Sequence, residues 1–453
     1  MSPGLLILII LCTGIAGLVL GRRRALLSAQ SSGQKLHSLP MAYGQSVFLF
    51  ATVPALLLVA VWLLLQPVFL EGRAAGMIPA SDIPAGSGIA LLLDEARRIA
   101  GGLPATAGTL PSVLAAAQAL SEGYESSRFT LSIAALALSL GGAVWAFLRI
   151  RPEARARNLV EQFILAMLMG ASLIAILTTL AIVASLIFET VHFFQVYEAR
   201  DFFLSLTWSP RFGGGSQLGL WPLLWGTLYI SFIALLFAVP VGLMAAIYLS
   251  EYAGPRMRAV AKPLIEILAG IPTIVYGLFA LITVGPLLRD YLAQPMGLGD
   301  SSSSVLTAGL VMGIMLIPFV SSLSDDIINA VPQAMRDGSY GLGATQSETI
   351  RQVVLPAALP GVVGAVLLAA SRAIGETMIV VMGAGAAAKL DLNPFEAMTT
   401  ITVKIVSQLT GDTEFASPET LVAFALGLTL FIFTLGLNIL ALVIVRKYRE
   451  QYE

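Results

Sequence analysis

The sequence predicts an all-α integral membrane protein, a polytopic bundle of about nine transmembrane helices. Of its 453 residues, 57% are hydrophobic and only 12% are charged, whereas soluble domains carry roughly 25% charged residues. The mean hydropathy is +0.86. The apolar residues also gather into long runs, and a spanning helix needs about 20 mostly apolar residues in succession.

Nine runs approach or exceed this length. In chain order they cover residues 3–20, 47–70, 129–148, 159–188, 223–249, 264–288, 305–323, 361–384 and 421–445. Pro240, Pro272 and Pro318 fall inside runs. Because proline removes a backbone donor and clashes with the preceding turn, we expect each of them to kink or break its helix.

The basic residues alternate between the connections. Most of the 26 follow the first, third, fifth, seventh and ninth runs, at positions 22–24, 35, 149, 151, 155, 157, 256, 258, 262, 336, 351, 446, 447 and 449. The positive-inside rule therefore predicts a multi-pass protein with its N-terminus outside and its C-terminus in the cytoplasm. The cluster Arg22–Arg24 follows the first run, an order that favours a retained helix over a cleaved signal peptide.

We expect the chain to divide at the basic linker 149–157. Residues 1–150 would form an N-terminal transmembrane extension of three spans. Its connection 71–127 is rich in Ala, Gly, Ser and Pro, and the charge pattern places it outside the cytoplasm. Residues 159–453 would form the main membrane domain of six spans.

Several kinds of chemistry are excluded by the residues present. Cys12 is the one cysteine, which rules out an intrachain disulfide and a cysteine-based metal cluster. His37 and His192 lie far apart in the sequence, so we expect neither a histidine metal site nor a catalytic triad. No GxxxxGK[ST] phosphate loop occurs, which argues against ATP hydrolysis by this chain. We expect no cofactor, no metal and no catalytic residue.

The segment 337–356, DGSYGLGATQSETIRQVVLP, is a polar, helix-compatible connection between two spans. The segment begins with Asp337-Gly338-Ser339. Three positions separate these residues from Gly343, nine separate Gly343 from Val353, and one separates Val353 from Leu355-Pro356. This spacing resembles the cytoplasmic EAA signature of ABC importer permeases. Gly338 and Ser339 stand where the signature has alanines, and they are poorer helix formers, so the start of the coupling helix is expected to be looser.

Two further segments are similar to phosphate-importer permeases: 270–277 (GIPTIVYG) and 371–378 (SRAIGETM). The combination of Gly-Ala-Thr at 343–345, Glu-Thr-Ile at 348–350 and the later Arg-Ala-x-Gly-Glu-Thr resembles the PstC type most closely. The resemblance extends from about Trp221 to the C-terminus. The three N-terminal spans lie outside the standard pattern.

The resemblance implies a type I ABC importer permease core with an N-terminal three-helix extension, in a bacterial inner membrane. The implied partners are a second, PstA-like permease, two PstB-like ATP-binding subunits and a periplasmic, PstS-like phosphate-binding protein. Besides these, phosphate and the lipid bilayer are expected, and nucleic acid is not. Contact with the ATPases is assigned to the coupling loop 337–356, through Asp337, Gly338, Ser339, Gly343, Ala344, Leu355 and Pro356.

Arg372 is the strongest candidate for the substrate pathway. A central arginine costs about 2.5–3.5 kcal/mol on insertion scales, and intramembrane charges usually face a bundle interior or polar cavity. Glu376 lies at i+4 and is predicted to pair with Arg372. On physical grounds a structural ion pair and a substrate site are equally good interpretations, and the resemblance favours the substrate site.

In that interpretation the guanidinium of Arg372 binds phosphate oxygens. Glu376 accepts a hydrogen bond from the P–OH group, which sulfate lacks at neutral pH. Thr377 could add a hydroxyl contact, although a bond to its own preceding turn is the simpler alternative. Thr273 and Tyr276 flank Pro272 and could line the pathway, whereas packing around a kink is the simpler alternative. Asp325 and Asp326 are expected only to cap a following helix.

Other functions remain open at the level of sequence. The chain could be a permease for another small anion or an organic solute, or a secondary transporter or channel that works alone. It could also be a membrane scaffold or sensor that transports nothing. A secondary transporter or channel that works alone would leave the loop 337–356 without a role.

Overall fold

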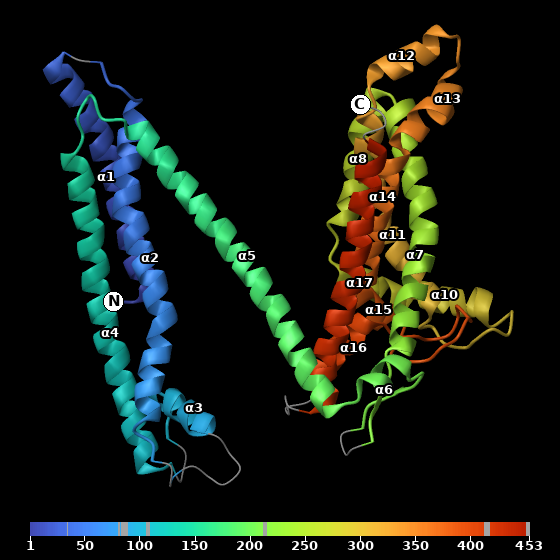
Figure 1. Ribbon diagram of the computed structural model, residues 1–453, viewed down its shortest axis with the longest axis horizontal. Helices are drawn as coiled ribbons and strands as arrows, with labels where there is room; N and C mark the ends of the chain where they lie inside the picture. Colours follow the sequence, from blue (N-terminus) through green and yellow to red (C-terminus); the bar gives the residue numbers. More distant parts are fainter. Residues whose placement is uncertain are drawn as a thin grey trace. The chain divides into compact units, whose positions relative to one another are not determined.

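The computed structural model describes residues 1–33, 35–79, 82, 89–105, 109–211, 215–411 and 417–449. Within these ranges the fold is helical (Figure 1), apart from a two-residue antiparallel pairing of β1 (Trp208–Ser209) with β2 (Gln217–Leu218). The described residues contain nine helical segments long and apolar enough to span a membrane. The predicted all-helical fold class and number of spans are therefore confirmed.

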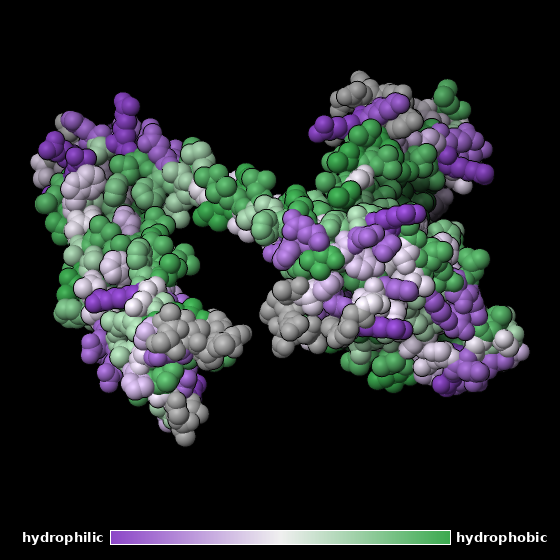
Figure 2. Space-filling model, turned by 60° about the horizontal axis from the view of Figure 1, so that its bottom comes forward, coloured by the Kyte–Doolittle hydropathy of each residue, from purple (hydrophilic) through white to green (hydrophobic). Residues whose placement is uncertain are grey.

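The chain forms two compact units, Met1–Leu177 and Thr178–Glu453. Their boundary falls within α5 (Ala156–Val196), a continuous helix of 41 residues. The most apolar 18-residue window of α5 has no buried residue, and Figure 2 shows a mostly hydrophobic surface along it. Such an apolar exterior is what a lipid environment favours.

The first unit is built on three long helices that lie side by side (Figure 1): α1 (Pro3–Ser32), α2 (Pro40–Ala75) and α4 (Pro111–Leu148). Each begins with proline in its first turn, where the missing N–H would have no helical partner. Gly44 of α2 lies against the backbone of Leu18, and Gly142 of α4 lies against the backbone of Phe50. Small residues at such crossings let membrane helices approach closely.

The connection 71–127 contains more helix than its composition suggests. Besides the end of α2 and the first 17 residues of α4, it holds the short helix α3 (Ile89–Ala100). Leu92 and Ala96 of α3 are buried against Val113 and Leu120 of α4. The alanines that suggested a loop are good helix formers, and burial of this apolar face stabilises the helix. Residues 80, 81, 83–88 and 106–108 of the connection lie outside the described part.

The second unit surrounds α11 (Val305–Asn329), whose most apolar window is 67% buried. It packs against α7 (Trp221–Ile247) and α14 (Leu355–Ile374). The other elements are α6 (Ala199–Leu204), α8 (Pro255–Ala269), α9 (Thr273–Phe279), α10 (Gly285–Leu288), α12 (Gln333–Gly341), α13 (Gln346–Thr349), α15 (Met378–Gly383), α16 (Ile401–Gly411) and α17 (Pro418–Arg449). Short π-helical turns occupy Tyr248–Tyr252, Ala280–Val284, Arg289–Ala293 and Ile350–Val354.

Proline breaks the predicted sixth run but not the fifth or seventh. Pro272 separates α8 from α9, as expected, whereas Pro240 and Pro318 lie inside the continuous helices α7 and α11. Consequently the sixth candidate span is Thr273–Ala293, with α8 as a separate helix before it.

The predicted eighth run, 361–384, is not one helix. Its candidate span is Gln346–Ile374, after which Gly375–Thr377 leave the helix and α15 begins at Met378. Hydropathy alone could not show this end, because Ile379, Val380 and Val381 continue the apolar run. Arg372 therefore lies in the last turn of a helix, not at its middle.

Candidate functional site

Arg372 lies in the last turn of α14 with its side chain exposed. Its guanidinium carbon is 5.6 Å from the centroid of the Phe319 ring on α11. None of the ion pairs among the described residues includes Arg372. An aromatic face attracts a cation without using its N–H donors, so the planar fork of Arg372 stays available to an oxyanion.

The predicted ion pair between Arg372 and Glu376 is not formed. The i,i+4 spacing brings two side chains together only on a continuous helix, and α14 ends at Ile374. Glu376 instead accepts hydrogen bonds at Oε1 from the backbone N–H groups of Met378 (3.0 Å) and Ile379 (3.3 Å). It thereby caps the first turn of α15, where a carboxylate also complements the helix dipole.

The helix break at Gly375–Thr377 is fixed by its neighbours. The hydroxyl of Thr402, at the start of α16, donates to the carbonyl oxygen of Glu376 over 2.9 Å. The hydroxyl of Thr377 makes a long contact, 3.5 Å, with the carbonyl oxygen of Gly375. This local bond is the simpler of the two alternatives for Thr377.

The structure brings the segment after Pro272 close to this break. Tyr276 of α9 shares one buried cluster with Ala373 and Ile379, and α9 packs against α15. Tyr276 is 6% exposed, and its hydroxyl donates to the carbonyl oxygen of Leu268 over 2.8 Å. That bond ties α9 to α8 across the proline break. Thr273 is the first residue of α9.

The predicted coupling segment forms two short helices, α12 and α13, near one end of the second unit (Figure 1). Asp337, Gly338 and Ser339 are helical, so the start of the segment is not unwound by its glycine and serine. The hydroxyls of Ser339 and Thr349 are 2.8 Å apart and join the two helices. Leu355 and Pro356 begin α14.

Between the two helices the chain turns at Gly343, whose φ is +88°. This left-handed conformation favours glycine, because a Cβ there is strained. Ala344 follows, and Thr345 then caps α13 through a capping box with Glu348. The turn also presents Leu342, which is 91% exposed. The one signal for Leu342 in the sequence is its position as an apolar residue between two glycines.

A buried ion pair that the sequence did not reveal anchors the coupling segment. Arg336, just before Asp337, lies 2.9 Å from Glu251, and each side chain is 9% exposed. Arg336 also donates to the carbonyl oxygens of Val331 (2.5 Å) and Ile328 (2.8 Å). Gln346 of α13 donates to the carbonyl oxygen of Glu251 over 2.6 Å. Both coupling helices are thus attached to the π-helical turn Tyr248–Tyr252 that follows α7.

The expectation for Asp325 is wrong, because α11 continues to Asn329 and Asp325 caps no following helix. Its side chain is 2% exposed and lies within 3.0 Å of Arg258 and 2.8 Å of Lys262, both on α8. The hydrogen bond to Asp325 raises the pKa of Lys262 above its ordinary value. Asp325 therefore holds α8 against α11, while Asp326 makes a longer contact with Lys262, 3.6 Å.

Lys404 of α16 is a further charged residue, which no motif in the sequence singles out. Burial lowers the pKa of its amine. No ion pair among the described residues includes it. It follows Thr402, which contacts Glu376, by two positions. Among the described residues, no group of three or more His, Cys, Asp or Glu side chains could hold a metal ion.

Two family models match the chain. Residues 7–178 match a family described as "Phosphate ATP-binding cassette transporter". Residues 238–450 match "Binding-protein-dependent transport system inner membrane component". Among solved structures, the chain is similar to a bacterial alginate ABC transporter complex at 17% identity and a TM-score of 0.43, covering 66% of this chain and 99% of that one.

Curated relatives match the second half of the chain. A probable ABC transporter permease of Bacillus subtilis is 34% identical over 232 residues, covering 51% of this chain and 73% of the relative. The phosphate transport system permease protein PstC 1 of Mycobacterium bovis is 37% identical over 252 residues, covering 51% and 74%. PstC of Mesorhizobium japonicum is 33% identical over 256 residues, covering 52% and 74%. The chain belongs to the binding-protein-dependent ABC transporter permeases, the non-catalytic membrane components of these transporters.

Proposed function

We propose that this chain is a PstC-type permease subunit of an ATP-driven phosphate importer. The observation that carries the proposal is the exposed guanidinium of Arg372, unpaired among the described residues, at the end of a membrane-spanning helix. A charge in this position is costly unless it faces a polar cavity or an ionic ligand. A small anion that binds there supplies the missing charge.

Phosphate is the anion that the relatives favour. Two relatives at 33% and 37% identity are named phosphate transport system permeases, and the model matching the N-terminal unit is described as a phosphate transporter. Glu376 uses Oε1 to cap α15, and its Oε2 accepts no hydrogen bond from the described residues. That oxygen can accept the P–OH proton, which gives a basis for discrimination against sulfate. Thr377, Thr273 and Tyr276 border the same helix breaks.

The proposed assembly follows from the family. Arg372 faces a pathway shared with a second, PstA-like permease, and a PstS-like protein delivers phosphate from the periplasm. Two PstB-like ATPases bind the α12–α13 segment in the cytoplasm, with Leu342 and Gly343 at its tip. This arrangement requires the N-terminus outside and the C-terminus inside, as the charge pattern predicts. Residues 1–150 form an extension to the permease domain, residues 159–453.

The test is uptake of radiolabelled phosphate by cells that depend on this complex. Arg372→Gln is expected to reduce uptake by about ten- to a hundredfold, because the loss of hydrogen bonds between a charged group and its ligand costs about 1.5–3 kcal/mol. The variant should still assemble with its partners. Arg200→Gln, the same charge change at an exposed position of α6, serves as the control and should transport normally.

Competition by sulfate, molybdate and arsenate determines the substrate. Arsenate, which resembles phosphate in shape and protonation, should compete, and sulfate should not. Strong competition by sulfate would indicate a permease for another small anion. Normal uptake by Arg372→Gln would remove Arg372 from the pathway.

A further inference from the structure

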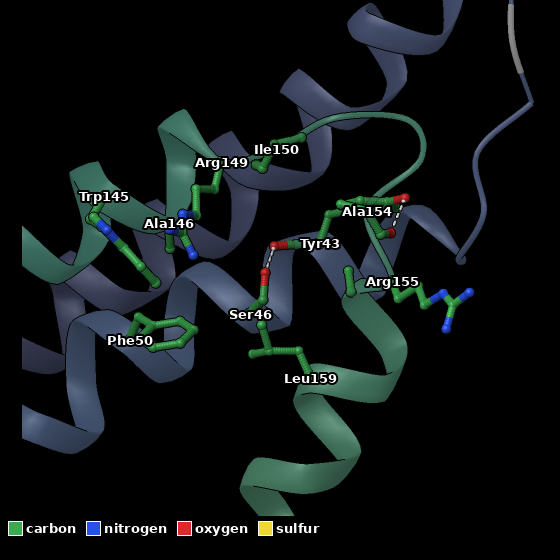
Figure 3. A pocket seen from close by; sticks show the side chains of 11 residues that line it. Tyr43, Ser46, Phe50, Trp145, Ala146, Arg149, Ile150, Ala154, Arg155 and Leu159 are labelled. Carbon is green, nitrogen blue, oxygen red and sulfur yellow. Dashed lines mark hydrogen bonds between the residues drawn. The ribbon is translucent and has the colours of Figure 1, made fainter.

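A cavity of about 230 Å³ lies in the first unit between the beginning of α2, the end of α4 and the start of α5 (Figure 3). Its lining combines apolar and aromatic side chains with two arginines. Among the residues that line it are Tyr43, Phe50, Trp145, Arg149, Arg155 and Leu159. None of them belongs to the substrate pathway or the coupling segment.

The wall of the cavity is held in place by a buried tyrosine. Tyr43 is 1% exposed, and its hydroxyl lies 3.0 Å from the carbonyl oxygen of Pro152 and 2.8 Å from that of Ala154. The hydroxyl of Ser46 donates to the carbonyl oxygen of Tyr43 over 2.8 Å. The N–H of His37 donates to the carbonyl oxygen of Pro152 over 3.0 Å. The turn between α4 and α5 is therefore fixed on α2, and the cavity is preformed.

The cavity carries positive charge that no carboxylate of the described residues balances through an ion pair. The guanidinium carbon of Arg149 lies 4.3 Å from the Trp145 ring centroid, and Arg155 stands at the rim with its guanidinium directed outward (Figure 3). Both side chains are exposed, and neither takes part in an ion pair with the described residues. The nearby Arg157, in contrast, is paired with Glu161 over 2.6 Å.

The cavity lies at the ends of three candidate membrane spans, which begin at Pro40, end at Leu148 and begin at Ala156. Lipid headgroups occupy this level of a bilayer. Trp145 and Leu159, which are 44% and 38% exposed, continue the apolar lining onto the outer surface of the helices. A ligand that fits both features has an anionic head for the arginines and a hydrocarbon chain for the apolar side.

We infer that this cavity binds the headgroup of an anionic phospholipid. The phosphodiester would accept hydrogen bonds from Arg149 at the wall and from Arg155 at the rim, with an acyl chain against Phe50, Trp145 and Leu159. Basic pockets between membrane helices are known to select anionic headgroups. The bound lipid would link α2, α4 and α5 at one end of the first unit. This inference is independent of the proposed substrate.

The test is retention of added lipid by the purified full-length chain in detergent, measured by native mass spectrometry. Phosphatidylglycerol should be retained and phosphatidylcholine should not. Because each arginine near a membrane surface strengthens the binding of anionic lipid, the double variant R149Q/R155Q should bind phosphatidylglycerol at least about tenfold more weakly. Arg151→Gln is the control: it removes one charge from the same turn outside the cavity lining, and binding should be unchanged.

Equal loss in Arg151→Gln and the double variant would overturn the inference, since the effect would then be one of general surface charge. Equal retention of phosphatidylcholine would overturn it as well. Displacement of phosphatidylglycerol by millimolar inorganic phosphate would show a free-anion site instead of a lipid site. Leu159→Trp keeps both arginines and narrows the apolar side, so it should also weaken retention. Unchanged binding in that variant would contradict the assigned acyl-chain position.

Discussion

Arg336 and Arg372 illustrate two ways in which a membrane protein uses a guanidinium. Arg336 is buried and satisfied by Glu251 and two carbonyl oxygens. Arg372 is exposed and has only an aromatic ring beside it. A buried, paired charge fixes structure, and an exposed charge at the end of a spanning helix needs an external partner. The first is a positioning residue for the coupling helix, and the second is the proposed ligand of the substrate.

Replacing Arg336 with Gln is expected to destabilise the purified chain by about 3–5 kcal/mol, because Glu251 then remains buried without its partner. The free energy of unfolding in a mild detergent, followed by denaturant titration, measures this loss. Glu251→Gln in addition should recover part of it, since the double variant buries no unpaired charge.

Arg351→Gln is the control for this prediction. Arg351 is exposed in the π-helical turn after α13, and its replacement should change stability by less than about 0.5 kcal/mol. If the Arg336 and Arg351 variants unfolded at the same denaturant concentration, the buried pair would not anchor the segment.

At the scale of elements, the coupling segment depends on a glycine that joins two helices. Gly343 has a φ of +88°, whereas Gly341 ends α12 without a positive φ. No heavy atom lies within 4 Å of a Cβ placed at either position. A methyl group therefore meets no neighbour within the chain at either site, and the two glycines differ in their backbone conformation.

This difference gives a prediction about coupling. Gly343→Ala should strain the turn by about 1–2 kcal/mol and lower the number of phosphate ions transported per ATP hydrolysed by the complex. Gly341→Ala should leave that ratio unchanged, because alanine is the better helix former. The measurement is parallel assay of uptake and ATP hydrolysis in proteoliposomes. Equal ratios for both variants and wild type would show that the left-handed turn is not needed for coupling.

The sequence predicted the elements better than their ends. The nine runs correspond in order to nine candidate spans in the described residues, because about 20 apolar residues in succession have few alternatives to a spanning helix. The end of α14 at Ile374 was not predictable from hydropathy. It depends on Glu376, which caps α15, and on Thr402, which contacts Glu376 from 26 positions further along the chain.

The contacts that shape the candidate site were also beyond the sequence. Glu251 and Arg336 are 85 positions apart, and nothing in their local patterns indicates that they meet. Asp325 was expected to cap a helix, and its partners on α8 are more than 60 positions away. Arg372 itself was found from the sequence, because a charge inside an apolar run is a local signal. Its role in the pathway stays a prediction.

At the scale of the whole molecule, the chain is a membrane component that does not itself catalyse ATP hydrolysis. The family is that of a non-catalytic transport component. The α12–α13 segment has an exposed apolar tip, Leu342, and the buried ion pair Arg336–Glu251 connects the segment to the turn that follows α7. Movement driven by ATP in neighbouring subunits could therefore be passed to α7, α11 and α14.

The most direct test compares the isolated chain with the assembled complex in proteoliposomes loaded with ATP on the side of the α12–α13 segment. We predict uptake of radiolabelled phosphate by the complex, dependent on ATP and on the phosphate-binding protein, and none by the chain alone. Phosphate uptake by the isolated chain, with or without ATP, would contradict this prediction.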